Sequence, residues 1–208
     1  MASATQGPDS GAMSDQMTDV PGAVPDVERL IEEVGRLRGK VLQLQERVEQ
    51  LDALAHQDTL INLPNRRGFL RELDRLIDRA QRYGHRAAML FVDLDGLKMI
   101  NDSFGHRAGD EALIQVAELL KRGVRRSDVV ARIGGDEFGI LIENASDESA
   151  HETASRLEQM IAACEVTHDG DILPLSVAIG IGMIDGDDTP DAVMARADEE
   201  MYRRKAAA

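Results

Sequence analysis

Residues 129–142 read VVARIGGDEFGILI, with two short apolar runs, Val129–Ile133 and Phe138–Ile142, on either side of Gly134-Gly135-Asp136-Glu137. The runs are short and rich in aliphatic, partly β-branched residues, which favours strands. A glycine pair between two strands predicts a tight hairpin, because glycine can take positive φ at both turn positions. Glycine also lacks a Cβ, so that a ligand can approach the backbone closely. The stretch therefore predicts a hairpin that presents two carboxylates at the edge of a sheet.

A second pair of carboxylates follows the apolar run Ala88–Val92, in Asp93-Leu94-Asp95-Gly96. Taken alone, Asp-x-Asp-Gly is typical of a polar turn after a strand. Magnesium, however, is usually held by one or two carboxylates together with substrate phosphates. If the strand ends that carry Asp93 and Asp136 are neighbours, the two side chains predict a metal–triphosphate site.

The residues that follow make the pattern specific. Residues 93–110 contain the full series Asp-Leu-Asp-x-x-Lys-x-Ile-Asn-Asp-x-x-Gly-His-x-x-Gly-Asp. This series and the GGDEF hairpin are accompanied by Asn65-Arg66-Arg67 upstream and by Ala197-Asp198, Tyr202 and Lys205 downstream. From about Asp58 to the C-terminus, the chain resembles the GGDEF family of diguanylate cyclases. The resemblance implies an α/β fold in which a mixed central sheet is covered by helices, similar to the palm of nucleotidyl cyclases.

Two departures from the family pattern are visible. The family usually reads Asp-x-Leu-Thr-Gly-Leu where this chain has Asp58-Thr59-Leu60-Ile61-Asn62-Leu63. The family also usually continues into Gly-Arg-Asn after the position of Lys205, where this chain has Ala206-Ala207-Ala208. The second difference removes a basic residue that is often placed near the phosphates.

The resemblance also implies the roles of the metal-site and phosphate residues. Asp93 and Asp136 would be side-chain ligands of two Mg²⁺ ions, with Mn²⁺ as a possible substitute, and Leu94 would offer its carbonyl. Glu137 would be either a further ligand or a group that helps to deprotonate the attacking hydroxyl, and the sequence leaves both roles open. Lys98 and Lys205 would hold phosphates as point charges, while Gly134 and Gly135 give the substrate access to the backbone.

Guanine recognition is expected at Asn101 and Asp110. A carboxylate can accept hydrogen bonds from guanine N1–H and the exocyclic amine together, whereas adenine has an acceptor at N1. A site with such polar groups rejects the mismatched base strongly. Without the family pattern, Asn101 would be taken for a turn residue and Asp110 for a charge near a helix N-terminus.

A regulatory site is expected upstream of the hairpin. Arg125-Arg126-Ser127-Asp128 contains the Arg-x-x-Asp that, at this spacing, is the inhibitory product site of the family. Arginine can pair with phosphate or a guanine edge, and aspartate can accept from guanine. Arg156, on the next predicted helix, is a further expected contact with cyclic di-GMP.

Composition limits the classes of protein to which the chain can belong. No stretch approaches the roughly 20 apolar residues that span a bilayer, and the N-terminus lacks the apolar core of a signal peptide. The single cysteine, Cys164, fits a reducing compartment. The net charge of −14, without a long basic run, argues against nucleic-acid binding. We therefore expect a cytoplasmic protein with no membrane or nucleic-acid partner.

The N-terminal part divides into two segments. Residues 1–26 contain no Lys or Arg and are rich in Gly, Pro, Ser and Asp, which predicts disorder. Residues 27–57 carry apolar residues at alternating spacings of three and four, with valine at most a positions and leucine at d: Val27, Leu30, Val34, Leu37, Val41, Leu44, Val48, Leu51 and Ala55. This pattern favours a helical stalk that forms a parallel two-stranded coiled coil and hence a homodimer. The alternative is an amphipathic helix packed on its own domain.

Residues 58–208 are expected to form the GGDEF domain. Helices are predicted over about 66–83, 108–123 and 147–163, with a last helix that Thr189 caps and Pro190 begins. Strands are predicted at 88–92, on both sides of the glycine pair, and at 173–181.

Two functions remain open. The first is a diguanylate cyclase that condenses two GTP molecules into cyclic di-GMP and two pyrophosphates, depends on the dimer, and is inhibited by its product. The second is a catalytically silent receptor that binds GTP or cyclic di-GMP and passes a signal through the stalk. The intact carboxylate pair and hairpin favour the enzyme.

Overall fold

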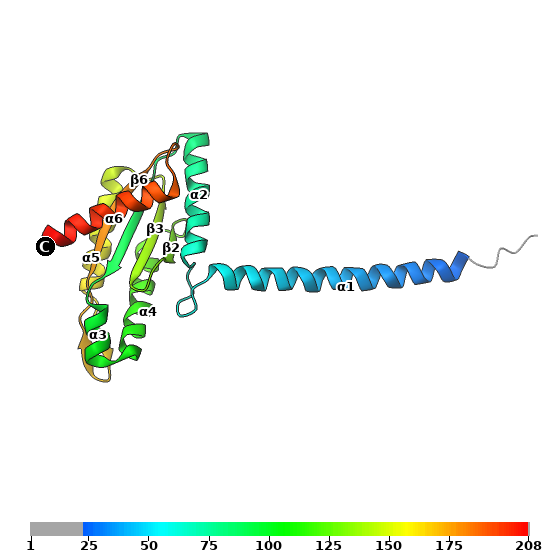
Figure 1. Cartoon of the computed structure of the whole chain (residues 1–208), viewed down its shortest axis with the longest axis horizontal. Coiled ribbons are helices and arrows are strands. Elements are labelled where there is room, and N and C mark those ends of the chain that lie inside the picture. The colour runs from blue at the N-terminus through cyan, green and yellow to red at the C-terminus, as the bar shows by residue number, and fades with distance from the viewer. Residues whose placement is uncertain (1–22, 208) are drawn as a thin grey trace, which may run out of the picture. The chain divides into compact units, whose positions relative to one another are not determined.

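The computed structural model describes residues 23–207 of the chain. The chain divides into a unit that ends at Val48 and a compact unit, Glu49–Ala208. The helix α1 (Ala23–His56) forms all of the first unit that is described, and its residues from Glu49 to His56 belong to the second (Figure 1). Since α1 begins at Ala23, residues 23–26 are helical and not disordered as predicted. The rest of the predicted disordered segment, residues 1–22, lies outside the described residues.

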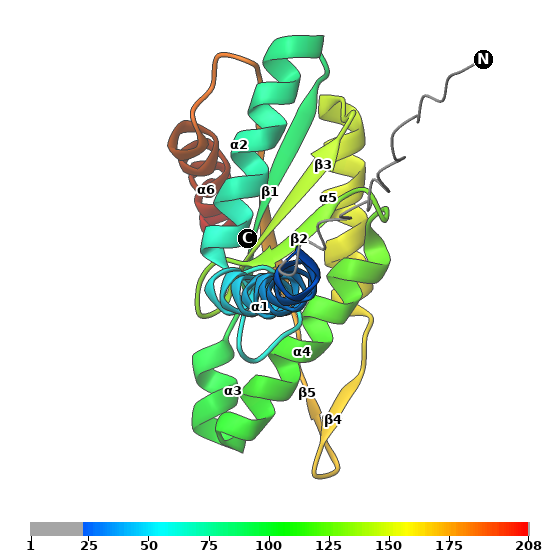
Figure 2. The ribbon, with the colours of Figure 1, turned by 90° about the vertical axis from the view of Figure 1, so that its right-hand side faces the viewer.

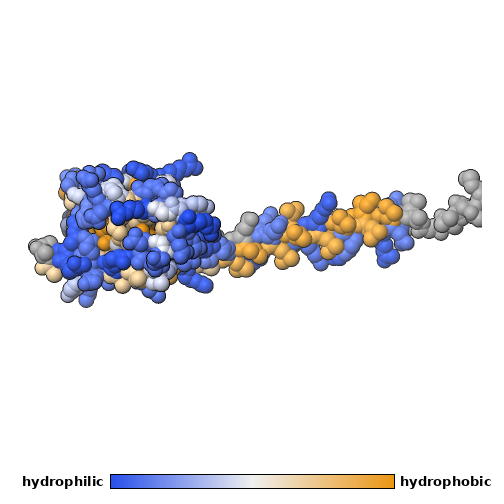
Figure 3. Space-filling model, turned by 90° about the horizontal axis from the view of Figure 1, so that it is seen from above, coloured by the Kyte–Doolittle hydropathy of each residue, from blue (hydrophilic) through white to orange (hydrophobic). Residues whose placement is uncertain are grey.

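The predicted coiled-coil seam of α1 is exposed in this single chain. Its valines and leucines from Val27 to Leu51 keep between 46% and 64% of their surface accessible. In Figure 3, hydrophobic residues recur along the helix. An exposed apolar stripe of this length is what an intermolecular seam requires. The dimer itself stays a prediction.

The compact unit is built around a sheet of order β2-β3-β1-β6 (Figure 2). The central strand β1 (Ala87–Leu94) pairs with β3 (Glu137–Glu143) and β6 (Val177–Ile184), while β2 (Val129–Arg132) pairs with β3 alone. The predicted α/β class with a helix-covered central sheet is confirmed. Every pairing in this sheet is antiparallel, however, so the expected mixture of parallel and antiparallel strands is wrong.

Helices cover both faces of the sheet. On one face, α2 (Arg66–Tyr83) and α6 (Pro190–Ala207) pack against Met89 and Phe91 of β1. On the other, α4 (His106–Gly123) and α5 (Asp147–Ala162) pack against Leu90 and Val92. This alternation follows from the period of two along a strand. It divides the core into one apolar cluster on each face of the sheet.

Three helix boundaries agree closely with the sequence predictions. The helix α2 spans the predicted residues, with Asn65 accepting from the backbone N–H groups of Arg67 and Gly68 and with Gly84 at φ +66° after the last turn. Pro190 begins α6, and the Thr189 hydroxyl accepts from the N–H of Ala192 at 3.3 Å. Ser146 caps α5 in the same way.

Other elements differ from the predictions. The short helix α3 (Leu97–Phe104) was not predicted, and α4 begins two residues before the predicted start. The predicted strand 173–181 is wrong, because its first residue ends a hairpin of β4 (Val166–His168) and β5 (Asp171–Leu173), and β6 begins only at Val177. Asp169 and Gly170 form the turn of this hairpin with φ of +51° and +94°. Asp-Gly is a strong hairpin signal that the sequence analysis overlooked. No helix in the described part of the chain is long and apolar enough to span a bilayer.

Candidate active site

The two predicted carboxylate pairs meet at one edge of the sheet. Asp93 on β1 lies directly opposite Glu137 on β3 in the strand register. The N–H of Leu94 donates to the carbonyl oxygen of Asp136 at 2.9 Å, which joins the end of β1 to the glycine turn. Asp93, Leu94, Asp136 and Glu137 therefore come together, as the family pattern implied.

The glycine turn works differently from the prediction. Neither Gly134 nor Gly135 has positive φ, so the expected turn type is wrong. A Cβ on Gly134 would lie 2.0 Å from a carboxylate oxygen of Glu137, which means that the missing side chain makes room for this carboxylate. A Cβ on Gly135 would meet no atom within 4 Å, so the backbone there is open to a ligand.

An arginine that the sequence analysis did not select holds this turn. The guanidinium of Arg132 donates to the carbonyl oxygen of Gly135 from Nη2 at 2.7 Å and from Nε at 3.2 Å. Its Nη1 lies 3.3 Å from the carboxylate of Asp58, and the two side chains are only 14% and 17% exposed. Asp58 in turn accepts from the N–H groups of Leu60 and Ile61. The linker between α1 and α2 is thus connected to the glycine turn.

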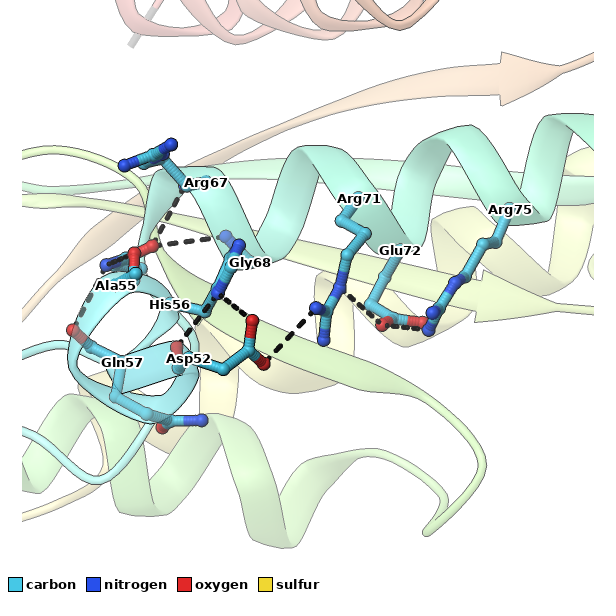
Figure 4. A network of polar contacts seen from close by, with 10 residues as sticks. Asp52, Ala55, His56, Gln57, Arg67, Gly68, Arg71, Glu72 and Arg75 are labelled. Atoms are coloured by element: carbon cyan, nitrogen blue, oxygen red, sulfur yellow. Dashed lines mark hydrogen bonds and ion pairs between the residues drawn. The ribbon is translucent and has the colours of Figure 1, made fainter. Parts of the chain in front are cut away.

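The linker is also fixed to the last turn of α1. The side chain of Asn65 donates to the carbonyl oxygens of Ala55 at 3.0 Å and Gln57 at 3.1 Å. Figure 4 shows Asp52 between His56 and Arg71, with carboxylate distances of 3.2 Å and 3.5 Å. These contacts lie within the compact unit and set where the end of α1 meets α2.

The surroundings of Glu137 change its pKa. Partial burial, followed by the charges of Asp136, Asp93 and Asp198, raises the pKa of Glu137, and only Arg66 opposes the shift. Asp198 and Arg66 were not predicted as site residues, although both belong to quoted family segments. Three carboxylates therefore lie close enough to Glu137 to add to the effect of burial, as expected where cations bind.

One cation of the chain lies in this cluster. Lys205, predicted to hold phosphate, has its Nζ 2.5 Å from Asp93 and 2.8 Å from Asp95. Partial burial disfavours the charged amine, but the hydrogen bonds and charges of the two carboxylates outweigh it and raise the pKa of Lys205. Asp95 is held by the Ser176 hydroxyl at 3.0 Å. The phosphate role of Lys205 stays a prediction.

The donor set suits magnesium. In the described residues, no group of three or more His, Cys, Asp or Glu side chains is arranged to hold a metal without other ligands. Magnesium does not need one, because it usually binds one or two carboxylates and completes its shell with waters and substrate phosphates. The carboxylates of Asp93 and Asp136, at adjacent strand ends, fit that requirement.

Of the predicted substrate residues, Asn101, Asp110 and Gly135 line one cavity of about 430 Å³ beside the turn, whereas Gly134 and Lys205 do not line it. Its wall includes Lys98 and Asn101 of α3, Asp110 of α4, and Gly135 and Asp136 of the turn. A Cβ on Gly109 would lie 2.1 Å from Oδ1 of Asn101, so this glycine lets the amide lie against α4. The cavity therefore places amide, carboxylate and lysine side chains within one space that the predicted metal ligand Asp136 also lines.

The three predicted product-site residues line a second cavity. Arg125, Asp128 and Arg156 surround a space of about 340 Å³. Asp128 accepts from the backbone N–H of Arg125 at 2.8 Å, and Arg156 donates to the carbonyl oxygen of Gly123 at 2.6 Å. The structure therefore brings these residues together, and their role in product binding stays a prediction.

Comparison with known proteins agrees with this site. The family model for the GGDEF domain of diguanylate cyclases matches residues 55–208. The diguanylate cyclase DgcP of Pseudomonas aeruginosa is 34% identical over 181 residues, which cover 87% of this chain and 27% of that protein. The bifunctional diguanylate cyclase and phosphodiesterase MucR of the same organism is 40% identical over 75% of this chain and 23% of its own length. The chain thus spans about a quarter of the length of these relatives.

Solved structures show the same fold. The coiled coil and GGDEF domain of DgcB from Caulobacter crescentus, crystallised in complex with c-di-GMP, superposes with a TM-score of 0.78 at 26% identity. The match covers 86% of this chain and 95% of that one. The GGDEF domain of TpbB from Pseudomonas aeruginosa matches with a TM-score of 0.70 at 39% identity, over 74% of this chain and 90% of that one.

Proposed function

Because this chain belongs to the GGDEF family of diguanylate cyclases, we propose that it condenses two GTP molecules into cyclic di-GMP and two pyrophosphates. The observation that carries the proposal is the cavity in which Lys98, Asn101 and Asp110 face the glycine turn. The carboxylates of Asp93 and Glu137 lie at the edge of the same turn.

The chemistry assigns a task to each group. The 3′-oxygen of each GTP attacks the α-phosphorus of the other, the bond from that phosphorus to the bridging oxygen breaks, and pyrophosphate leaves with the electron pair. Asn101 and Asp110 would orient guanine, and Lys98 and Lys205 would neutralise phosphate charge. The proton of the 3′-hydroxyl needs an acceptor. The raised pKa of Glu137 suits that role, while a role as metal ligand stays open.

Two Mg²⁺ ions, or Mn²⁺ in their place, are proposed at Asp93, Asp136, Glu137 and the carbonyl of Leu94. When bound, such ions stabilise the charge that develops on the phosphate oxygens. The protein's contribution is to hold these donors at adjacent strand ends, where the bond from Leu94 N–H to the Asp136 carbonyl oxygen fixes their spacing.

We propose that activity depends on a homodimer. Each domain has one cavity for one GTP, and the product requires two GTP molecules to face each other. The exposed valine and leucine stripe of α1 supports a parallel coiled coil that raises the local concentration of the second domain. The crystallised relative DgcB also pairs a coiled coil with a GGDEF domain.

Product inhibition is proposed at Arg125, Asp128 and Arg156. The shared cavity supports it, because two guanidinium groups and a carboxylate can together recognise phosphate and guanine. The complex of DgcB with c-di-GMP shows that a related domain binds this product. Since GTP is supplied in the cytoplasm, we place the domain there.

The test is direct. The protein is incubated with GTP and Mg²⁺, and nucleotides are separated by chromatography. The proposal expects cyclic di-GMP and pyrophosphate, loss of turnover in Asp136→Asn with the fold intact, and little change in the control Asp74→Asn, an exposed carboxylate on α2. Turnover in Asp136→Asn near the wild-type rate would contradict the ligand assignment.

The alternative is a receptor that binds GTP or cyclic di-GMP without turnover. The product-site cavity alone would serve that function. Tight nucleotide binding in calorimetry, together with no product after long incubation of a dimeric sample, would favour the receptor.

A further inference from the structure

The free edge of β6 is bound by three side chains of α6. Arg196 donates from Nη2 to the carbonyl oxygen of Met183 at 2.7 Å, and Arg204 donates from Nη1 to that of Ile179 at 2.7 Å. Between them, the carboxylate of Glu200 accepts from the backbone N–H of Ile181. These strand residues alternate, so their backbone groups point away from β1.

The spacing of the three contacting side chains along α6 matches the spacing of their partners along β6. Four residues of an α-helix rise about 6 Å, and two residues of a strand rise about 6.5 Å. Side chains at every fourth position of α6 therefore meet every second residue of β6, with the helix running antiparallel to the strand. A row of this kind fixes the helix along the strand axis, because a shift of one turn would lose all three contacts or exchange their partners.

Two glycines of β6 bring the helix close. A Cβ on Gly180 would lie 2.1 Å from the carbonyl oxygen of Ala197, and one on Gly182 would lie 2.9 Å from that of Val193. The backbone of α6 thus lies against β6 with no side chain between them. This contact is independent of the polar row and supports the same register.

The last contact of this row, between Arg204 and Ile179, lies next to the active site. Ile179 pairs with Val92, the residue before Asp93, in the register of β6 with β1. Arg204 binds Ile179 and also lies 3.3 Å from the carboxylate of Glu158 on α5. The next residue, Lys205, contacts Asp93 and Asp95. Lys205 therefore lies in the last described turn of α6, one residue after the end of the row.

We propose that Arg204 is a positioning residue of the active site. Its bonds to the Ile179 carbonyl oxygen and to Glu158 hold the last turn of α6 in register, so that the Lys205 amine stays at the metal-site carboxylates and within reach of the substrate phosphates. The inference rests on the proposed function, because only a phosphate role for Lys205 gives this position kinetic consequences. The competing explanation is that the row merely covers an exposed strand edge.

The neighbouring arginine provides a matched control. Arg203 is exposed and donates within its own helix, to the carbonyl oxygen of Glu199. We expect Arg204→Ala to lower kcat/KM for GTP with Mg²⁺ by about tenfold, as a misplaced group does. Arg203→Ala should stay within about twofold of wild type, a difference that side-chain loss on the surface allows. Arg204→Lys should recover part of the loss, since one amine cannot bind both partners as the planar guanidinium does.

A double mutant separates positioning from mere stability. In a Lys205→Ala background, Arg204→Ala should cause less than about a twofold further loss, because the two residues act as a unit. A second readout does not depend on turnover. In amide hydrogen exchange, residues 200–206 should exchange faster in Arg204→Ala than in Arg203→Ala, while α2 should be unchanged.

Each result decides the proposal. Equal kinetics for the two alanine variants, faster exchange without a kinetic change, or the same loss with and without Lys205 would each overturn it. If Arg204→Ala fails to fold, Arg204→Lys and Glu158→Gln are compared with Arg203→Ala by the same two measurements. Absence of any wild-type turnover would contradict the proposed function instead, and the exchange comparison would still test the anchor.

Discussion

Replacement of Arg132 by methionine tests how the active-site turn is held. The change removes two hydrogen bonds to the Gly135 carbonyl oxygen and the ion pair with Asp58, while it keeps an unbranched apolar chain of similar length. Asp58 does not lose all its partners, because it still accepts from the N–H groups of Leu60 and Ile61. The expected loss is therefore smaller than that for an orphaned buried charge.

The magnitude follows from burial and from the number of bonds. Hydrogen bonds from a charged donor contribute about 1.5 to 3 kcal/mol each, and loss of one partner of a buried ion pair costs about 3 to 5 kcal/mol. Because Arg132 and Asp58 are 14% and 17% exposed, we discount these figures for solvent screening. We expect the free energy of unfolding to fall by about 2 to 4 kcal/mol. Looser placement of Asp136 should reduce kcat by about 10- to 100-fold.

The assay is urea unfolding followed by circular dichroism at one protein concentration, since the proposed dimer makes stability depend on concentration. Arg122→Ala is the control, because its ion pair with Glu118 is 73% and 53% exposed and should contribute less than about 1 kcal/mol. The double mutant with Asp58→Asn should lose less than the sum of the two single changes. If Arg132→Met unfolds within about 0.5 kcal/mol of the control, the turn is held by its glycines and strands alone and the reasoning is wrong.

Three further predictions address inhibition, assembly and pH. Arg125→Ala should relieve inhibition by added cyclic di-GMP with little change in the initial rate, because Arg125 lines the product-site cavity and not the substrate cavity. Leu37→Asp combined with Leu44→Asp should give a monomer in sedimentation, with specific activity that falls steeply on dilution, since unpaired charge in a buried seam is strongly unfavourable. The hydrogen bond to Glu111 raises the pKa of His168. Protonated His168 should therefore stabilise the fold below the ordinary histidine pKa of about 6.5, and this contribution should disappear as pH rises through the higher folded-state value. The urea midpoint of His168→Gln should accordingly fall below wild type more at acidic than at alkaline pH.

Matched controls accompany these tests. Arg126→Ala changes a neighbouring arginine outside the product-site cavity and should leave inhibition intact. Leu42→Asp places one such charge on α1 but off the predicted seam, so the dimer should persist. Unchanged inhibition in Arg125→Ala, or equal activity of intact and seam-broken protein at nanomolar concentration, would contradict the respective proposals. If the difference in urea midpoint between His168→Gln and wild type is the same at acidic and at alkaline pH, the prediction for His168 is contradicted.

The sequence predicted the elements whose signals are local. Asn65 and Gly84 mark the ends of α2 through cap chemistry, and Thr189 and Pro190 mark the start of α6. The spaced family pattern selected Asn101 and Asp110 as substrate residues, and the structure places both in the wall of one cavity. The exposed seam of α1 likewise has the period that the heptad predicted.

The errors have physical causes. A Gly-Gly pair permits positive φ but does not require it, and here Gly134 is needed because the Glu137 carboxylate occupies the space of a side chain. The strand at 173–181 was predicted as one element because most of its residues are apolar. Pro174, however, cannot donate to a ladder, and the true hairpin signal lay earlier, at Asp169-Gly170.

The contacts that support the site could not be predicted, because they join residues far apart in the chain. Arg132 meets Asp58 across 74 positions, Ser176 meets Asp95 across 81, and Lys205 meets Asp93 across 112. Neither the hydrophobic periodicity of the sequence nor a helix-capping residue indicates such a pair. Each depends on where whole elements pack, and α6 reaches β1 only because Gly180 and Gly182 admit it against β6.

This long-range support has a consequence for how the site forms. The carboxylates of Asp93 and Asp136 come from β1 and the hairpin, but Lys205 comes from the last helix and binds across β6. Burial, followed by the like charges at the sheet edge, raises the pKa of Glu137, so a cation at this edge favours its assembly. Docking of α6 supplies that cation, and its register on β6 decides whether the cation reaches the carboxylates. The electrostatics of the site therefore depend also on the two glycines of β6 and on the contacts of Arg196, Glu200 and Arg204 with its edge, although none of these residues lines the substrate cavity.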